Sequence, residues 1–227
     1  MTAEVGREVL TRSVEDYLKA IYRLSADGHP ASTSQIAQLL ELSAPSVSGM
    51  VRRLSEQGLL EHVPYRGVLL TAEGRRIALR MIRRHRLLEA YLVAFLGYTW
   101  DTVHEEAERL EHAVSDPLVE RMAHALGHPR VDPHGDPIPA PDGSMEEAPH
   151  LPLTEVPVGE SVVICRADTT DDGLLRYIAS SALMPGTRVT VVEHQPFHGP
   201  LRLRADSGER VIGHELAGIL LCAREEQ

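Results

Sequence analysis

The chain has 227 residues, of which 43% are hydrophobic, and this is enough for two or three small domains with cores of their own. Its formal net charge of −10 argues against non-specific nucleic-acid binding by the whole molecule. The first ten residues lack the basic-then-apolar pattern of a signal peptide, and the most apolar stretch, 87–96, is too short to cross a membrane. A cytoplasmic protein is therefore expected.

The charge is distributed unevenly along the chain. Residues 1–86 carry a balance of +4, whereas residues 87–227 carry −14. This asymmetry favours a DNA-binding head and a cation-binding body, although solvated surface charge alone can also produce it. The two cysteines, Cys165 and Cys222, lie far apart in apolar segments, so we expect core residues rather than a zinc site or a disulfide.

The first 74 residues predict a winged helix-turn-helix domain. Apolar residues at helical spacing predict a helix over 13–25, and serine and threonine caps precede a short helix around Ile36. After a turn, Pro45 begins a further helix that runs to Gln57. Two strands then flank residues 64–67 and form the wing.

The helix from Pro45 to Gln57 predicts a DNA-reading surface. Its apolar residues form one buried stripe: Val47, Met50, Val51 and Leu54. The polar and small residues face outward: Ser46, Ser48, Gly49, Arg52 and Arg53. Short hydroxyls can reach base edges, while the arginines, with Arg66 in the wing, can contact phosphates. A winged helix that binds only protein is the alternative.

The middle of the chain predicts a helical body, residues 75–127. Helices are expected over 72–96, 101–114 and 116–126. The proline-rich segment 128–153 is expected to be a linker, because it cannot hold a helix or a central strand. Residues 154–227 predict a small β-barrel, with strands at 161–167, 188–192, 200–205 and 218–223 around a helix at 174–182.

Metal-binding residue types concentrate beside the buried face of the helix predicted over 101–114. The apolar stripe consists of Val103, Ala107, Leu110 and Val114, and the adjoining face carries four donors: His104, Glu108, Glu111 and His112. An acidic, solvated helix face is the alternative for this segment alone. On the preceding helix, His85 and Glu89 are four residues apart and can point at one cation.

A third source of donors is Asp16, which lies about 200° around the first helix from Val14 and so points away from that helix's core. Carboxylates with imidazoles suit Mn²⁺ and Fe²⁺, and no thiolates that would favour zinc or copper lie in these helices. A zinc protease is not indicated, because an H-E-x-x-H motif would need histidine where Glu108 stands.

Taken together, these segments resemble the diphtheria toxin repressor family of iron- and manganese-dependent regulators, over nearly the whole chain. The matching motifs are EDYLKAIYRL, SAPSVSGMVRRLSEQGLL, RRHRLLEAYL, VHEEAERLEHAVSD and DPHGDPIP. The resemblance implies a mainly α fold with a small β part. It consists of an N-terminal winged helix-turn-helix (1–74), a helical metal-binding and dimerisation domain (75–127), a tether (128–153) and a C-terminal SH3-like, FeoA-like barrel (154–227).

The resemblance also implies two metal sites. The primary site maps to Asp16, Glu108, Glu111 and His112, and the ancillary site to His85, Glu89 and His104, with Asp171 or Asp172 of the barrel as further oxygen ligands. Iron-type members carry Met and Cys in place of Asp16 and Glu108, so this chain is more similar to the manganese-type members. Lys19 stands where some small manganese regulators have a ligating glutamate, which favours separate sites over a paired-metal centre.

Ser43, Pro45, Ser46 and Ser48 match the family's DNA-contacting positions, and Gly49 replaces a common glutamine, so the operator sequence is expected to differ from the iron-type one. The sequence thus predicts a homodimeric, non-enzymatic regulator that binds operator DNA when Mn²⁺ or Fe²⁺ is loaded. Neither a membrane nor a small-molecule substrate is expected as a partner. The alternative is a cytosolic metal buffer or protein adaptor, whose metal sites would have no effect on DNA.

Overall fold

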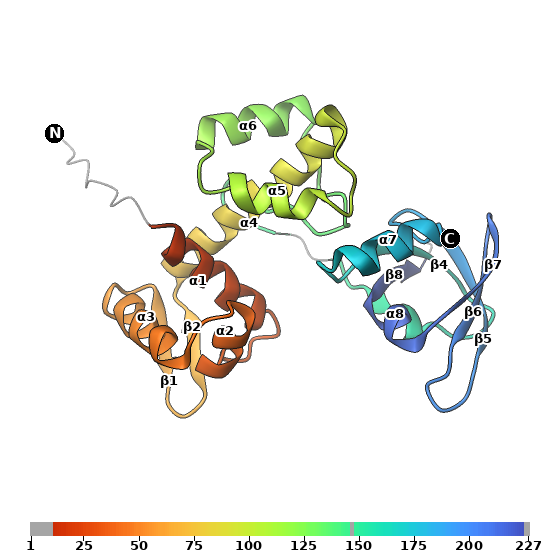
Figure 1. The fold of residues 1–227 in the computed structure, drawn as a ribbon, viewed down its shortest axis with the longest axis horizontal. Coiled ribbons are helices and arrows are strands. Elements are labelled where there is room, and N and C mark those ends of the chain that lie inside the picture. Colours follow the sequence, from red (N-terminus) through yellow and green to blue (C-terminus); the bar gives the residue numbers. More distant parts are fainter. Residues whose placement is uncertain (1–10, 146–147, 225–227) are drawn as a thin grey trace. The chain divides into compact units, whose positions relative to one another are not determined.

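A computed structural model of the chain describes residues 11–145 and 148–224 (Figure 1). The expectation that the first ten residues form no signal peptide lies outside these residues. The chain divides into two compact units, Met1–Arg83 with Pro139–Gly143 and Arg84–Ile138 with Ser144–Gln227. In the described ranges, no helix is both long enough and apolar enough to cross a membrane.

The first unit contains the predicted winged helix. Its elements are α1 (Arg12–Leu24), α2 (Thr33–Leu39), α3 (Ala44–Glu56), β1 (Leu60–Val63) and β2 (Gly67–Leu70). Ser32 begins α2 through a capping box with Gln35, which satisfies two backbone N–H groups at the helix start. Leu18 and Ile21 of α1, Ile36 of α2 and Leu54 of α3 are fully buried, and α2 packs against both α1 and α3.

The wing depends on a glycine. β1 and β2 pair antiparallel, and the backbone of Val68 also bonds in both directions to Ala31, at 2.9 and 3.0 Å. Gly67 has a φ of +128°, and a Cβ there would lie 2.1 Å from the carbonyl oxygen of Ala31. Only glycine allows the strand to approach so closely.

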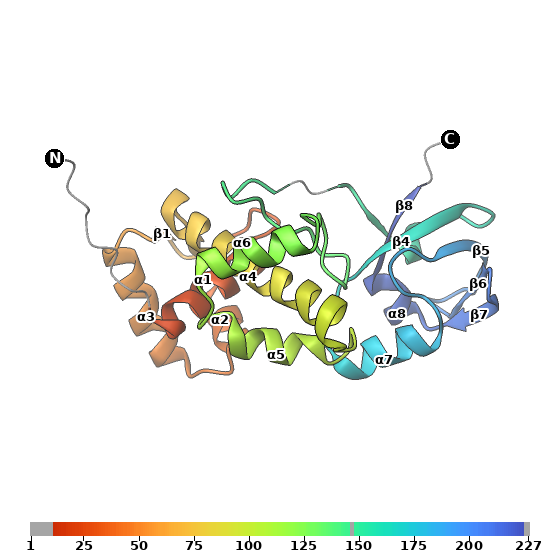
Figure 2. The same ribbon diagram turned by 90° about the horizontal axis from the view of Figure 1, so that it is seen from above.

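The helical body consists of the second half of α4 (Ala72–Leu96) with α5 (Val103–Leu110) and α6 (Asp116–Ala125). Both ribbon views show α5 and α6 on either side of α4 (Figure 1, Figure 2). Their shared core contains buried residues of all three helices: Leu87, Leu88, Ala107, Val119, Met122 and Ala123. Buried Arg84 also pairs with Asp116 at 2.7 Å and so fastens the start of α6.

The helix predicted over 101–114 is shorter than expected. The amide of Glu111 still donates to Ala107, but the amide of Ala113 donates to Leu110 three residues back, so the helix tightens into a turn. Ser115 and Pro117 then start α6. Glu111 and His112 consequently lie in the turn after α5, while Leu110 and Val114 remain packed against the body's core.

The segment after α6 has a specific conformation at residues 131–138. Val131 bridges to Pro137, and the amide of Asp132 donates to the carbonyl of Asp136 at 3.0 Å. Gly135 lies against the barrel, where an added Cβ would be 1.9 Å from the carbonyl oxygen of Cys165. This part of the proline-rich segment is therefore a tightly packed loop.

The remaining strands form a six-stranded antiparallel sheet in the order β3-β8-β4-β5-β6-β7. The elements are β3 (Leu151–Pro152), η1 (Leu153–Glu155), β4 (Ser161–Ala167), α7 (Asp172–Ser180), β5 (Arg188–His194), β6 (Leu201–Ala205), β7 (Gly208–Ile212), α8 (His214–Ile219) and β8 (Leu220–Arg224). Figure 2 shows the strands gathered beside α7 and α8. The sequence predicted β4, β5, β6, β8 and α7 but missed β3, η1, β7 and α8, and residues 218–219 of the strand predicted over 218–223 belong to α8.

The barrel core includes a residue of the helical body. Trp100, which precedes α5, is 6% exposed and packs in the same cluster as the apolar residues of the sheet. Cys222 is also buried there, as predicted, and burial raises its pKa to about 12, so the thiol stays neutral. Cys165 is only half-buried, and both cysteines are free.

Candidate nucleic-acid interface and metal centre

The α3 surface has the exposed face that the sequence predicts. The candidate DNA-contacting residues of this element are all exposed: Ser43, Pro45, Ser46, Ser48, Gly49, Arg52 and Arg53. The predicted stripe is buried at Val47, Val51 and Leu54 and half-buried at Met50.

The serines at the start of α3 are organised by local hydrogen bonds. The Ser43 hydroxyl accepts from the amide of Ser46 at 3.4 Å, and the two hydroxyls lie 2.9 Å apart. Ser48 donates its hydroxyl to the carbonyl of Ala44 at 2.9 Å. A hydroxyl that donates inward keeps oxygen lone pairs for a donor outside the protein. The start of α3 is thus a polar surface with its side chains already oriented.

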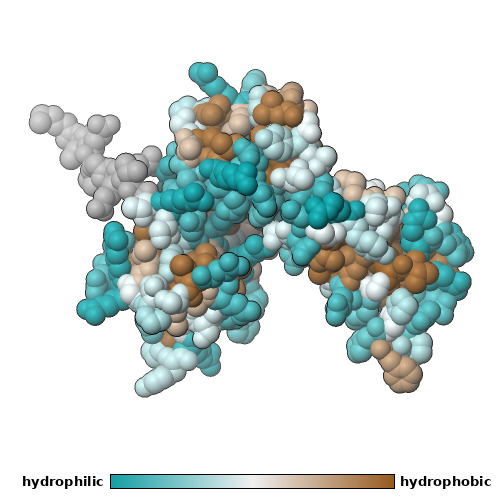
Figure 3. All heavy atoms as spheres, in the orientation of Figure 1, coloured by the Kyte–Doolittle hydropathy of each residue, from teal (hydrophilic) through white to brown (hydrophobic). Residues whose placement is uncertain are grey.

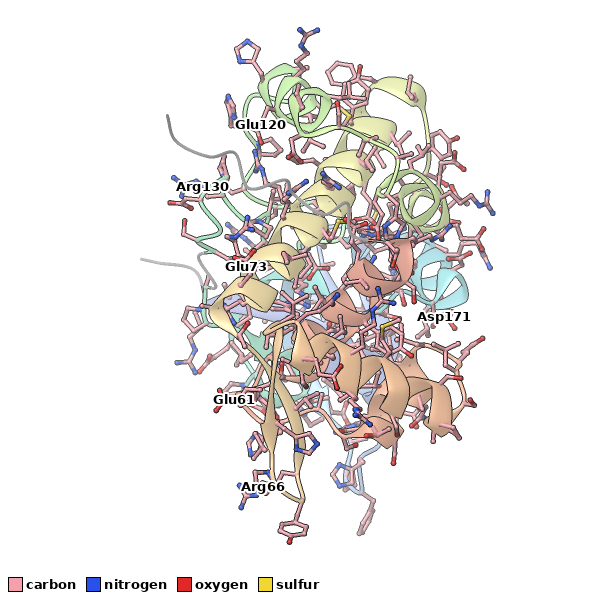
Figure 4. The ribbon with its side chains drawn as sticks, turned by 90° about the vertical axis from the view of Figure 1, so that its left-hand side faces the viewer. Glu61, Arg66, Glu73, Glu120, Arg130 and Asp171 are labelled. Carbon is pink, nitrogen blue, oxygen red and sulfur yellow. The ribbon has the colours of Figure 1, made fainter. Side chains whose placement is uncertain are left out.

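Arginines extend this surface to the wing. Arg66 lies at the far end of the β1–β2 hairpin (Figure 4) and is exposed, as is the neighbouring Tyr65. Arg52 is held by Glu56 at 2.9 Å, and Arg53 stands in the last turn of α3. Exposed guanidinium groups of this kind are suited to contacts with phosphate.

The metal-binding residues predicted on the body form one mostly buried cluster. Glu111 is 0% exposed, Glu89 1% and His85 8%, while His104 and Glu108 are half-buried. Buried charged side chains are rare unless they are paired or bind metal. The burial therefore rules out the alternative of a solvated acidic helix face.

His85 is the centre of this cluster. Its Nδ1 lies 2.6 Å from Glu111 Oε2, and its Nε2 lies 2.9 Å from Glu89 Oε1 and 3.0 Å from His104 Nδ1. Glu108 Oε1 is 3.8 Å from a ring nitrogen of each histidine, so Glu108 lies closest to the predicted ancillary residues. The two predicted sites are adjacent, and His85 connects them.

Electrostatics favour a cation at the cluster. Burial by itself raises the pKa of Glu89, but the charge of His85 and hydrogen bonds from the surrounding histidines hold that pKa well below its usual range. The ionised carboxylate thus needs a nearby positive charge, either a proton on imidazole or a metal ion. Carboxylate oxygens and imidazole nitrogens converge here, and this donor set fits Mn²⁺ or Fe²⁺.

The loop at 131–138 adds two residues that the sequence did not predict as ligands. Asp132 is 6% and His134 5% exposed, and together with Glu89 they form a buried group of donors that lie within 4.8 Å of one another. Burial opposes protonation of His134, but its contacts with Glu89, the charge of Asp132 and the carbonyl of Trp100 raise its pKa to about 9. Burial and the charges of Asp136 and Glu89 raise the pKa of Asp132 to about 7.

The remaining predicted ligands belong to the helical body, the first unit and the barrel. His112 is half-buried, and its Nε2 is 3.4 Å from Glu111 Oε1, so it lies with the predicted primary residues of the body. Asp16 is half-buried on α1 in the first unit, 3.9 Å from Arg12. Asp171 caps α7 by accepting from the amide of Leu174 at 2.8 Å (Figure 4), and neither it nor Asp172 belongs to a donor group of the described residues.

Three family models match consecutive parts of the chain. Residues 9–68 match the N-terminal DNA-binding domain of iron-dependent repressors, and residues 71–140 match their metal-binding and dimerisation domain. Residues 151–223 match the FeoA domain.

Curated relatives are similar over most of their length. The chain is 34% identical over 220 residues to the iron-dependent repressor IdeR of Mycobacterium leprae, covering 92% of this chain and 95% of the relative. It is 32% identical over 196 residues to the diphtheria toxin repressor of Corynebacterium efficiens, covering 82% of this chain and 85% of that relative.

Solved structures are similar over the same extent. A manganese-dependent transcriptional repressor in complex with manganese is 40% identical, with a TM-score of 0.85 and coverage of 93% of this chain and 100% of that one. ScaR with bound Zn²⁺ is 33% identical, with a TM-score of 0.80 and coverage of 93% and 99%.

Proposed function

The chain belongs to the iron-dependent repressor family, which includes the diphtheria toxin repressor, and we propose that it represses manganese- or iron-uptake genes when its metal sites are loaded. The family consists of metal-dependent transcription repressors with DNA-binding and dimerisation domains, and it is not a family of enzymes. The observation that carries the proposal is the buried cluster around His85, in a chain that also presents the exposed serines and arginines of α3.

Two sets of residues would hold the metal. Glu108, Glu111 and His112, joined by Asp16, form the proposed primary site. His85, Glu89 and His104 form the ancillary site. One oxygen of Asp171 accepts from the amide of Leu174, so its second oxygen, or Asp172, would supply the further oxygen ligand from the barrel. A bound divalent ion supplies two positive charges, and these hold the carboxylates and imidazoles together.

Metal binding is proposed to act on DNA through geometry. A dimer places two recognition helices in successive major grooves only when their separation matches about one helical turn, roughly 34–36 Å. Asp16 belongs to the DNA-binding unit, so its capture by metal would restrict the two heads of the dimer. By linkage, operator DNA would tighten metal binding by the same factor.

The proposed dimer surface consists of exposed hydrophobic residues of α4 and α6 in the helical body. Phe95 and Leu96 of α4 and Leu118 of α6 are large hydrophobic residues with between 46% and 60% of their surface exposed. Figure 3 shows hydrophobic side chains gathered around α6. Burial of these residues against a second copy would remove them from water, as in other homodimers.

Manganese is the proposed signal, with Fe²⁺ as the second choice. The ligands proposed for the primary site are three carboxylates and one imidazole, which are hard or borderline donors. The two cysteines lie in β4 and β8 of the barrel, and neither belongs to the cluster. We propose that the protein acts in the cytoplasm, where it can reach both DNA and imported metal.

The test is a fluorescence-anisotropy titration of the homodimer on promoter DNA from a manganese transporter, in excess Mn²⁺ and in chelator. Binding that needs Mn²⁺ and falls steeply with salt is expected, because phosphate contacts release counterions. Equal affinity in chelator and in Mn²⁺ would reject the metal switch. Tight Mn²⁺ binding with no effect on any DNA would indicate a metal buffer.

A further inference from the structure

The group formed by Glu89, Asp132 and His134 contains two carboxylates and one imidazole from two different segments. Glu89 comes from α4, and the other two come from the loop at 131–138. All three are less than 7% exposed, and their ligand atoms lie within 4.8 Å of one another. Neither of the two metal sites proposed above uses Asp132 or His134.

The ring of His134 is oriented as metal-bound histidines usually are. Its Nε2 lies 2.6 Å from the carbonyl oxygen of Trp100. Because a carbonyl only accepts, this nitrogen carries the proton, and Nδ1 is the nitrogen that faces Glu89 Oε2, at 3.6 Å. A hydrogen bond from one ring nitrogen to a backbone carbonyl, with the other nitrogen on the metal, is the common arrangement in metal sites.

Asp132 also keeps one oxygen for a ligand. Its Oδ1 accepts from the amides of His134 and Asp136, at 2.8 and 3.0 Å. Among the described residues, the ion pair of its Oδ2 is a long contact of 3.7 Å with the Nε of Arg86. That guanidinium is engaged by the Asp136 carboxylate at 3.2 Å and by the Pro137 carbonyl.

The two oxygens of Glu89 face different groups. Oε1 lies 2.9 Å from His85 and 3.0 Å from His104, and Oε2 faces His134. A carboxylate placed this way can bind one ion with each oxygen. The 3.6 Å between His134 Nδ1 and Glu89 Oε2 lies between the roughly 3 Å that separates donors at right angles and the roughly 4.2 Å that separates opposite donors, on an ion with bonds of about 2.1 Å.

We propose that Glu89, Asp132 and His134 bind a third divalent metal ion, with Glu89 as a carboxylate bridge to the ion of the ancillary site. The two carboxylates and one imidazole favour Mn²⁺ or Fe²⁺ over softer ions. This third ion goes beyond the proposed function, which needs only two ions per chain. Its site nevertheless shares Glu89 with the proposed ancillary site.

The third ion fastens the loop between the helical body and the barrel. The carbonyl of His134 accepts from the amide of Ala167 in β4 at 3.0 Å, and Asp136 pairs with Arg166 of β4 at 2.8 Å. Metal bound at His134 therefore joins α4 to a loop that is already bonded to the barrel.

The test counts Mn²⁺ ions per chain of the full-length protein by the loss of the free-ion EPR signal during titration. The wild type is expected to bind three, while His134→Ala and Asp132→Asn bind two. His124→Ala removes an exposed histidine from α6 and should still bind three. A bridged pair also gives an exchange-coupled EPR signal, which the two loop variants should lose.

Asp132→Asn keeps an oxygen that can accept the two loop amides, so it remains informative if His134→Ala does not fold. Two ions in the wild type, or three ions in both loop variants, would overturn the third site. Two ions with no coupled signal would mean that His134 only neutralises Glu89. Failure of the proposed function would differ, because operator affinity would then be equal in chelator and in Mn²⁺, whatever number of ions the wild type binds.

Discussion

The recognition surface on α3 and the cluster around His85 differ in how their side chains are positioned. The α3 serines are exposed, and their hydrogen bonds join residues three or four positions apart. The cluster is buried, and His85 contacts residues 19 and 26 positions away. The DNA-reading part thus depends on local helix geometry, and the metal-sensing part depends on tertiary packing.

This comparison predicts that damage to the cluster has the larger effect on DNA binding. In His112→Ala, Mn²⁺-dependent operator affinity should fall at least about 100-fold, because the imidazole of the proposed primary site is lost. Anisotropy titration on operator DNA measures this effect. His104→Ala should weaken the response to Mn²⁺ yet retain binding at high Mn²⁺. The substitution is made at His104 and not at His85, because His85 also contacts Glu111 of the proposed primary site.

His124→Ala serves as the matched control, since it removes an exposed histidine. All three variants should remain dimers by light scattering. Should His104→Ala abolish binding while His112→Ala leaves it intact, the primary and ancillary assignments are reversed.

Two glycines in the DNA-binding unit predict opposite changes in stability. Gly67→Ala should lower the free energy of unfolding by about 2–3 kcal/mol, because a Cβ would lie 2.1 Å from the Ala31 carbonyl at a φ of +128°. Gly49→Ala, in α3 with open space around it, should raise the stability by about 0.5–1 kcal/mol.

Urea unfolding followed by far-UV circular dichroism measures both changes. The single tryptophan, Trp100, lies in the second unit, so its fluorescence should report little change. Equal stability of the two variants would show that the wing tolerates a Cβ at position 67.

The metal preference can be changed separately from the DNA surface. The double substitution Asp16→Met with Glu108→Cys should shift activation from Mn²⁺ towards Fe²⁺, Co²⁺ or Zn²⁺ by roughly tenfold, because softer sulfur ligands replace oxygens. Activation curves with each metal test this shift. Glu105→Cys adds a thiol at an exposed position of α5 and should keep the wild-type order of metal preference. If the double variant also keeps that order, metal selectivity does not depend on Asp16 and Glu108.

The smallest effect is expected at the wing. Arg66→Ala should reduce the slope of log affinity against log salt by about 1, since one phosphate contact is lost. Arg204→Ala, an exposed arginine of the barrel strand β6, is the control and should keep the wild-type slope. A slope that does not change in Arg66→Ala would mean that the wing does not contact phosphate.

The amino-acid sequence by itself determined the elements whose signals are local. Periodic apolar residues predicted α1, α3, α4 and α6, and the serine and proline at the start of α3 predicted its first turn. The exposure of the α3 side chains followed from the same periodicity. β3 and α8 have too few residues for a periodic signal, and β7 lacks an apolar alternation because Ile212 is its one buried residue. The early end of α5 depends on how the chain turns into α6.

Only the tertiary structure decided which donors meet. The sequence placed metal-binding residue types on the right helices, but burial of Glu89 and Glu111 follows from the packing of α4 against α5. The segment DPHGDPIP was expected to be a tether because its prolines exclude helix and strand. Asp132 and His134 of this segment became candidate ligands only because Gly135 lets the loop pack against β4. The carbonyl of Trp100 also fixes the ring of His134. Contacts between residues distant in the chain leave no periodic pattern, and so the sequence alone could not show them.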